Sequence, residues 1–410
     1  MTVRIRCRAA LAAGLIALSS AVAATVPATA DTTVALPGDD PFYLGPDGWQ
    51  TSAPGAVLRT RTVTLAPTAV ELPISATQVL YTTTDQFGKP DATVATVIRP
   101  PSASGPLRVV SHQTAYDSLS TGCDPSFALR GGGEGAPQDA VIIAGYLAAG
   151  LTVVVSDYEG SKLAYGTGRL SGAAALDGIR AALRVLDAPA TTPVGMSGFS
   201  GGSIATEFAA ELAPAYAPEL NIVGVTAGGM PVDMADTIDY VDGSPQWALV
   251  LPYVMQGSAR GFDLDLSPYL SDYGRDVMAQ IADHCVTNGP RFPGLRLSQL
   301  LSPEYQNYRS IPKFARILTE NHMGDTGTPT APLLFGAGNV DGIGDGVIVA
   351  AGERILATEY CHRGVSVQYD EYPGSNHLLA GVLFFPTARA FLLDRFAGTP
   401  FASGCSQLDR

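Results

Sequence analysis

A serine at position 200 stands in the glycine-rich pentapeptide Gly198-Phe199-Ser200-Gly201-Gly202. The pattern G-x-S-x-G is typical of a nucleophile on a tight turn between a strand and a helix. Glycines two residues before and after the serine fit such a turn, because side chains there would collide. We therefore interpret Ser200 as a nucleophile, with the backbone N–H of Gly201 as one donor to an oxyanion.

The residues on both sides of the pentapeptide have the pattern that this turn requires. A short apolar run, PVGMSGF at 193–199, precedes the serine and predicts a strand. After it, Ile204, Phe208 and Leu212 recur at intervals of four, which predicts one face of a helix. Ser200 would then lie at a helix N-terminus, where unpaired N–H groups favour negative charge.

A serine hydroxyl needs a base, and the chain has only five histidines. His377 is the best candidate, in the sequence YPGSNHLLAG. It follows a predicted strand and precedes an apolar helical run, so we expect it on a loop at the carboxyl edge of a sheet. The alternative is a histidine that only caps the next helix.

The acid should follow the predicted strand 331–338, and GNVDGIGDGVIVA offers Asp341 and Asp345. We favour Asp345, because the 32 positions from it to His377 leave room for one helix and one strand. Asp341 remains the alternative, its other reading being a turn residue. The order nucleophile, acid, histidine is that of α/β-hydrolases.

Strands alternate with helices, which predicts an α/β protein with a mostly parallel sheet covered by helices on both faces. A β-hairpin is predicted at 76–100 and helices at 173–186 and 387–398, whereas 31–58 looks irregular. Further strands are predicted at 107–112, 151–157, 220–229, 331–338 and 365–374.

The alternation breaks at 234–326, which we interpret as a helical lid or cap inserted over the carboxyl edge of the sheet. The two parts of the core would then be 31–233 and 327–410. The insertion has apolar residues that could form its core, shield an acyl tunnel or meet a lipid surface: Trp247, Leu251, Tyr253 and Met255.

Residues 1–30 have the pattern of a cleaved export signal: a basic start, an apolar stretch at 9–24 and Ala28-Thr29-Ala30. We therefore predict a secreted, extracellular protein. Four cysteines remain beyond this segment, and in an oxidising compartment they allow three disulfide pairings. We favour Cys123 with Cys285 and Cys361 with Cys405.

The amino-acid composition of the chain limits the kinds of molecule that it is expected to bind. The formal net charge of −13 makes nucleic acid an unfavourable partner, because phosphate binding requires a basic surface. Scattered histidines and the lack of a C-x-x-C pair argue against a metal site, and no cofactor is indicated. The loop after strand 107–112 contains Asp117, which is either a helix N-cap or part of the site.

Long blocks of this chain resemble the secretory lipase family of fungi and actinobacteria. They include 198–233, AYDSLSTGCDPSF, VVVSDYEGSKLAYGTGRLSGAAALDGIRAAL, and the tail from DGVIV to YPGSNH. The resemblance implies an α/β-hydrolase fold with a helical lid and hydrolysis of carboxylic esters, including triacylglycerols.

The resemblance also implies roles for individual residues. It places the nucleophile on Ser200, the acid on Asp345 and the base on His377. It places the oxyanion site on Asp117 with the Gly201 amide, and it implies the disulfide pairing favoured above.

The segment GNVDGIGDG is longer and richer in glycine than the loop usual in the family, so Asp341 remains an alternative candidate for the acid. Residues 234–326 are only loosely similar to the family. We expect a lipid or small ester as substrate and a transient lipid interface. The competing hypotheses are a short-chain carboxylesterase or other α/β-hydrolase, and a secreted binding protein without activity.

Overall fold

The computed structural model describes residues 34–408 except 69, 103, 104 and 134. The predicted export signal, 1–30, lies outside the described residues.

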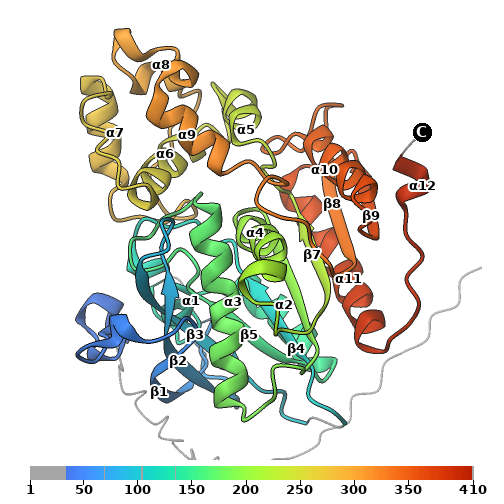
Figure 1. Cartoon of the computed structure of the whole chain (residues 1–410). Coiled ribbons are helices and arrows are strands. Elements are labelled where there is room, and N and C mark those ends of the chain that lie inside the picture. Colours follow the sequence, from blue (N-terminus) through green and yellow to red (C-terminus); the bar gives the residue numbers. More distant parts are fainter. Residues whose placement is uncertain (1–33, 69, 103–104, 134, 409–410) are drawn as a thin grey trace, which may run out of the picture. The chain divides into compact units, whose positions relative to one another are not determined.

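A nine-stranded sheet forms the centre of the described chain (Figure 1), with the order β1-β2-β3-β5-β4-β6-β7-β8-β9. Its strands are β1 (Val57–Thr64), β2 (Ser75–Thr84), β3 (Pro90–Ile98), β4 (Val109–Gln113), β5 (Thr152–Ser156), β6 (Val194–Phe199), β7 (Ile222–Gly228), β8 (Leu333–Asn339) and β9 (Val367–Pro373). Strands β4 to β9 are parallel, and β1, β2 and β3 extend the sheet in antiparallel pairs. The predicted parallel sheet and the hairpin β2–β3 are confirmed.

Helices cover both faces of the sheet. The α-helices are α1 (Pro125–Ala128), α2 (Pro137–Ala148), α3 (Gly168–Val185), α4 (Gly201–Tyr216), α5 (Met234–Val241), α6 (Val250–Gly261), α7 (Asp272–Ile281), α8 (Leu297–Leu300), α9 (Pro312–Glu320), α10 (Ala350–His362), α11 (His377–Phe396) and α12 (Cys405–Leu408). Short 3-10 turns are η1 (Pro37–Asp39), η2 (Pro41–Tyr43), η3 (Trp49–Thr51), η4 (Thr121–Cys123), η5 (Pro303–Tyr305) and η6 (Tyr308–Ser310).

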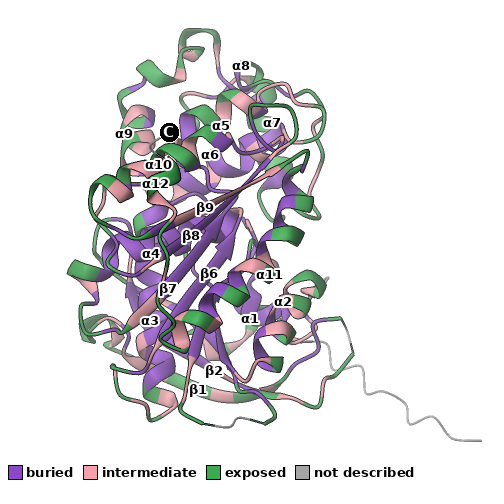
Figure 2. Ribbon diagram, turned by 90° about the vertical axis from the view of Figure 1, so that its right-hand side faces the viewer, coloured by how far each residue is buried: buried purple, intermediate pink, exposed green. Residues whose placement is uncertain are grey.

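The side chains of β5 point alternately to the two faces of the sheet, and each face packs against its own set of helices. Val154 points into the core that α3, α4 and α10 cover, whereas Val153 and Val155 point into the core beneath α2 and α11. Because both sides of the strand are buried, its three central residues, Val153, Val154 and Val155, are all apolar. Figure 2 shows that β6, β7 and β8 of the same sheet are likewise mostly buried.

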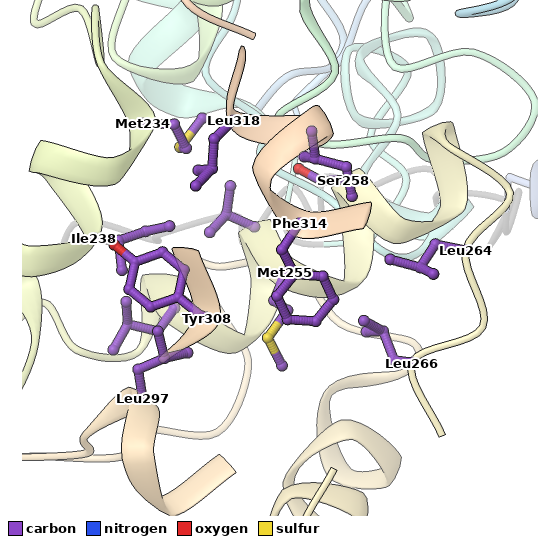
Figure 3. Close-up of a pocket in the computed structure, with 13 residues that line it drawn as sticks. Met234, Ile238, Met255, Ser258, Leu264, Leu266, Leu297, Tyr308, Phe314 and Leu318 are labelled. Carbon is purple, nitrogen blue, oxygen red and sulfur yellow. The ribbon is translucent and has the colours of Figure 1, made fainter. Parts of the chain in front are cut away.

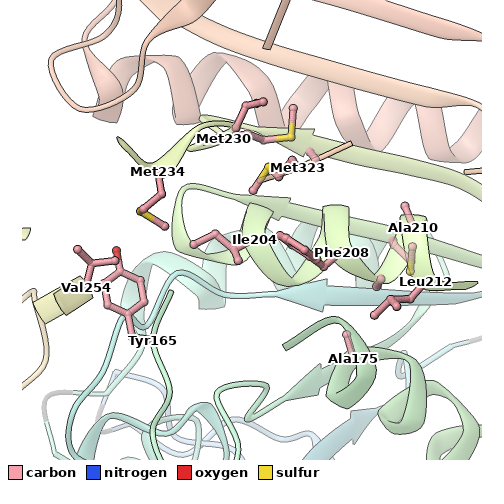
Figure 4. Packing of buried hydrophobic residues seen from close by; sticks show 14 of the residues in the cluster. Tyr165, Ala175, Ile204, Phe208, Ala210, Leu212, Met230, Met234, Val254 and Met323 are labelled. Carbon is pink, nitrogen blue, oxygen red and sulfur yellow. The ribbon is translucent and has the colours of Figure 1, made fainter. Parts of the chain in front are cut away.

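Helices α3 and α4 pack unusually closely, and this fixes the position of the serine turn at the start of α4. Phe208 of α4 is fully buried (Figure 4), and its ring lies against Gly168 of α3. A Cβ atom at Gly172 would lie 2.7 Å from the backbone nitrogen of Ala209. A glycine is therefore required where the two helices cross.

The sequence analysis missed one strand and misjudged the extent of two helices. Strand β1 was not predicted, since its side chains are mostly polar and partly exposed along an edge of the sheet. Helix α3 starts at Gly168, earlier than the predicted 173. Helix α11 runs from His377 through Pro386 to Phe396, so the helical run expected after His377 and the helix predicted at 387–398 form one helix, which ends two residues earlier than predicted.

The segment 234–326, which we predicted to be an insertion and call the insertion below, lies between β7 and β8 and contains α5 to α9; these helices lie together above the sheet in Figure 1. Disulfides join Cys123 to Cys285 and Cys361 to Cys405, the favoured pairing. The first links the loop after β4 to the insertion, and the second ties the C-terminal segment to the end of α10.

Replacing both Cys361 and Cys405 with serine should lower the unfolding free energy by about 4 kcal/mol, because the open chain gains loop entropy when unfolded. That corresponds to a fall in the melting midpoint of roughly 5 °C. Differential scanning calorimetry without reductant measures the change, and the control is wild-type protein with reductant, whose midpoint should also fall. An unchanged midpoint in the double variant would contradict this role.

Candidate active site

Ser200 lies on a tight turn between β6 and α4 with backbone angles φ 56° and ψ −129°. This conformation is unfavourable for a residue with a side chain. Its neighbours hold it there: the N–H of Ser200 donates to the carbonyl of Gly228 at 2.9 Å. A Cβ at Gly198 would collide with the carbonyl of Gly202, and one at Gly202 with the carbonyl of Gln113. The glycine spacing is therefore a steric requirement of the turn.

The imidazole of His377 lies between the serine and a carboxylate. Its Nδ1 is 2.7 Å from Oδ2 of Asp345, and its Nε2 is 2.7 Å from Oγ of Ser200. A carboxylate can only accept, so Nδ1–H donates to Asp345 and Nε2 is left to accept the proton of the serine hydroxyl. This arrangement can activate an alcohol as a nucleophile.

The two candidate acids lie in different environments. Asp345 is buried, and its Oδ1 accepts hydrogen bonds from the N–H groups of Val347 (2.9 Å) and Ile348 (2.7 Å). Asp341 is exposed and accepts from the backbone of its own turn, which lowers its pKa. Its other oxygen accepts from Tyr240 Oη at 2.8 Å. Asp345 is the carboxylate next to the imidazole, and Asp341 is a turn residue.

His377 is the first residue of α11, not a loop residue as predicted. Asn376 caps this helix, and its side chain accepts from the N–H of Leu379 at 3.0 Å. The imidazole is further held by the rings of Phe199 and Trp247, whose centroids are 5.2 and 5.6 Å from its own. A helix start gives a more rigid position than a loop.

Asp117 and Gly201 lie together beside Ser200. A Cβ added to Gly201 would overlap Oδ1 of Asp117, so the carboxyl group packs directly on this glycine. That Oδ1 atom is buried without a hydrogen-bond partner. Burial raises the pKa of Asp117 to about 7, against the opposing influence of a positive charge on His377. The N–H of Gly201, first in its helix, has no acceptor within the helix.

The loop that carries Asp117 is held at several points. The backbone carbonyl of Asp117 accepts a hydrogen bond from the N–H of Val286 at 3.0 Å. Ser118 forms an isolated β-bridge with Cys285. The buried carboxylate of Glu159 accepts the N–H of Ser118 at 3.1 Å. Asp117 itself has a positive φ of 39°. The candidate oxyanion site is therefore fixed in part by the insertion.

Two buried acids that support the site were missed in the sequence. Glu159 is one, and Glu353 of α10 is the other: its carboxylate accepts the N–H of Met230 at 2.9 Å, just after β7. Burial raises the pKa of both groups. No local pattern marks these acids in the sequence: Glu159 stands in the mixed segment VVVSDYEGSKLAYG, close to Asp157 and Lys162.

A cavity of about 50 Å³ lies at Ser200, and its lining is shared between core and insertion. The core supplies Asp117, Gly201 and His377, and the insertion supplies apolar side chains that include Trp247 and Leu251. Among the described residues, no group of three or more His, Cys, Asp or Glu side chains is placed to hold a metal ion.

A second cavity, of about 60 Å³, lies entirely within the insertion (Figure 3). The residues that line both cavities are Met234, Ile238, Leu251 and Val254. Ser258 and Tyr308 bring the only side-chain oxygens of the second lining; its other side chains are apolar, among them Phe314 and Leu318. The two spaces are thus neighbours separated by flexible aliphatic side chains.

The four apolar residues singled out in the insertion are not exposed. Leu251 and Tyr253 are buried, and Trp247 and Met255 are half-buried. Three of them line the cavities, and Tyr253 belongs to the core. The expectation that they meet a lipid surface finds no support in their burial.

Several known proteins are similar to this chain. The secretory lipase family matches residues 136–404. Over 380 residues the chain is 36% identical to a protein described as a probable inactive lipase from Mycobacterium tuberculosis, covering 89% of this chain and 83% of that protein. Lipase A of Arthroderma benhamiae is 32% identical over 394 residues, 90% of this chain and 81% of that protein.

Among solved structures, Candida antarctica lipase A in its closed state superposes with a TM-score of 0.82 and 30% identity. The match covers 90% of this chain and 89% of that one.

The assignment of the acid can be tested without a substrate. Asp345→Ala should slow the labelling of Ser200 by a fluorophosphonate probe by about 10³-fold or more, because the imidazole loses its orienting partner. Asp341→Ala, the matched control, should label within a few-fold of wild type. In-gel fluorescence time courses measure both rates, and a larger loss for Asp341→Ala would reverse the assignment.

Proposed function

The chain belongs to the secretory lipase family, and from this premise we propose that it is a secreted carboxylic ester hydrolase, most specifically a triacylglycerol lipase. The observation that carries the proposal is the continuous pair of 2.7 Å contacts from Asp345 through His377 to Ser200. Family membership alone does not suffice, since one relative is described as probably inactive.

In the proposed reaction Ser200 Oγ attacks the ester carbonyl while Nε2 of His377 takes its proton. Asp345 keeps the imidazole in the required tautomer and stabilises the imidazolium. The Gly201 N–H and Asp117 stabilise the oxyanion. His377 then protonates the leaving alcohol, and water attacks the acyl-enzyme with the same histidine as base.

The linings of the two cavities favour a substrate with a long acyl chain. The site cavity is walled by aliphatic and aromatic side chains of the insertion, and the second cavity continues behind Leu251 and Val254. An acyl chain passing between these side chains would reach toward Phe314 and Leu318. Burying each CH₂ group contributes about 0.8 kcal/mol, so such a path favours longer esters.

Export is part of the proposal. Residues 1–30 have the pattern of a cleaved signal, and the two disulfides are typical of a protein that folds in an oxidising compartment.

Hydrolysis of p-nitrophenyl esters of graded chain length tests the function directly. We expect activity that rises from acetate toward longer chains, and Ser200→Ala should lose it by several orders of magnitude while remaining folded. Thermal unfolding of the variant is the control. A maximum at acetate would favour the short-chain esterase, and no hydrolysis of any ester would favour the binding protein.

The role of Asp117 predicts a pH dependence. A carboxyl with a pKa of about 7 donates a hydrogen bond only when protonated, so kcat/KM should fall as pH rises above about 7. Asp117→Asn keeps a donor that does not titrate, so this fall should disappear. Rates on p-nitrophenyl butyrate from pH 5.5 to 9 measure it, with Asp341→Asn as the matched control. An identical alkaline fall in Asp117→Asn would show that the side chain is not the donor.

A further inference from the structure

Exposed aliphatic side chains gather on the two segments that carry Asp345 and His377. Large hydrophobic residues that are 42–68% exposed lie in the loop before the acid and in the first two turns of α11. We call them the α11 surface: Val340, Ile343, Leu378, Leu379, Val382 and Leu383. Contiguous exposed apolar groups commonly mark an interaction site.

Helix α11 has no polar outer face at this end. It buries Ala380, Phe384 and Ala388 at intervals of four, and it leaves Leu379 and Leu383 exposed. A surface helix normally places charged residues there, yet none occurs from 377 to 388. By length and composition α11 would suit a membrane span, but its packing on β7 and β8 makes it a covering helix.

Backbone hydrogen bonds join the two segments into one region. The N–H of His377 donates to the carbonyl of Asp345 at 2.9 Å, and the N–H of Gly374 donates to the carbonyl of Asn339 at 2.7 Å. The α11 surface is thus a fixed neighbour of the candidate triad.

We propose that the α11 surface rests on an aggregate of uncharged lipid, such as a triacylglycerol droplet. This inference rests on the proposed function and places the lipid contact on the core rather than on the insertion. The absence of charge from 377 to 388 and the net charge of −13 favour a neutral surface over an anionic membrane. Contact at the segments that hold the triad brings esters close to Ser200.

Adsorption to a triolein emulsion tests the proposal. The variant Val382→Gln with Leu383→Gln keeps helix propensity and removes apolar contact. In a Ser200→Ala background, which excludes hydrolysis, it should bind droplets at least tenfold more weakly than Ser200→Ala alone. The matched control is Ile355→Gln on α10, which is 59% exposed on another helix and should bind as the background does.

Equal adsorption of the double variant and the background would overturn the proposal. Sedimentation gives a second contrary outcome: a dimer that the double variant dissociates, with droplet binding unchanged, would make the α11 surface a contact between copies. Circular dichroism checks folding, and Val340→Gln with Ile343→Gln repeats the test if the helix variant is unfolded. Because adsorption is measured without hydrolysis, wild-type cleavage of dissolved esters tests the proposed function separately.

Discussion

The strained backbone at Ser200 is the constraint on which the rest of the structure depends. A residue with φ 56° and ψ −129° persists only where its surroundings fix it. Here the bond to Gly228, the close approach of Gly202 to Gln113 and the burial of α4 against α3 fix it. The turn points a hydroxyl at the imidazole of His377 and leaves the first N–H of α4 open beside it.

Burial governs the electrostatics around this turn. Asp345 accepts two hydrogen bonds from backbone N–H groups and lies 2.7 Å from the imidazole nitrogen, so its oxygens act as acceptors. Asp117 has a buried oxygen without a partner, and its pKa is raised to about 7, so a protonated carboxyl is accessible there. Two aspartates beside the same histidine are thus suited to opposite roles, one as acceptor and one as donor.

The sequence predicted what local spacing encodes: the serine turn, the strand and the helix that flank it, and an acid 32 positions before the histidine with α10 and β9 between them. It failed where partners are distant. Glu159 holds Ser118 from 41 positions away and Glu353 holds Met230 from 123, and no local pattern marks either acid. The apolar helical run expected after His377 and the helix predicted at 387–398 belong to one helix, because α11 continues through Pro386.

The central claim is that Ser200, His377 and Asp345 act as one unit, and a double-mutant cycle tests it most directly. If they do, Ser200→Ala with His377→Ala should lose no more kcat on a dissolved p-nitrophenyl ester than Ser200→Ala alone. Losses that multiply, so that the double variant is slower by the product of the single effects, would show that the two side chains act independently and would contradict the account.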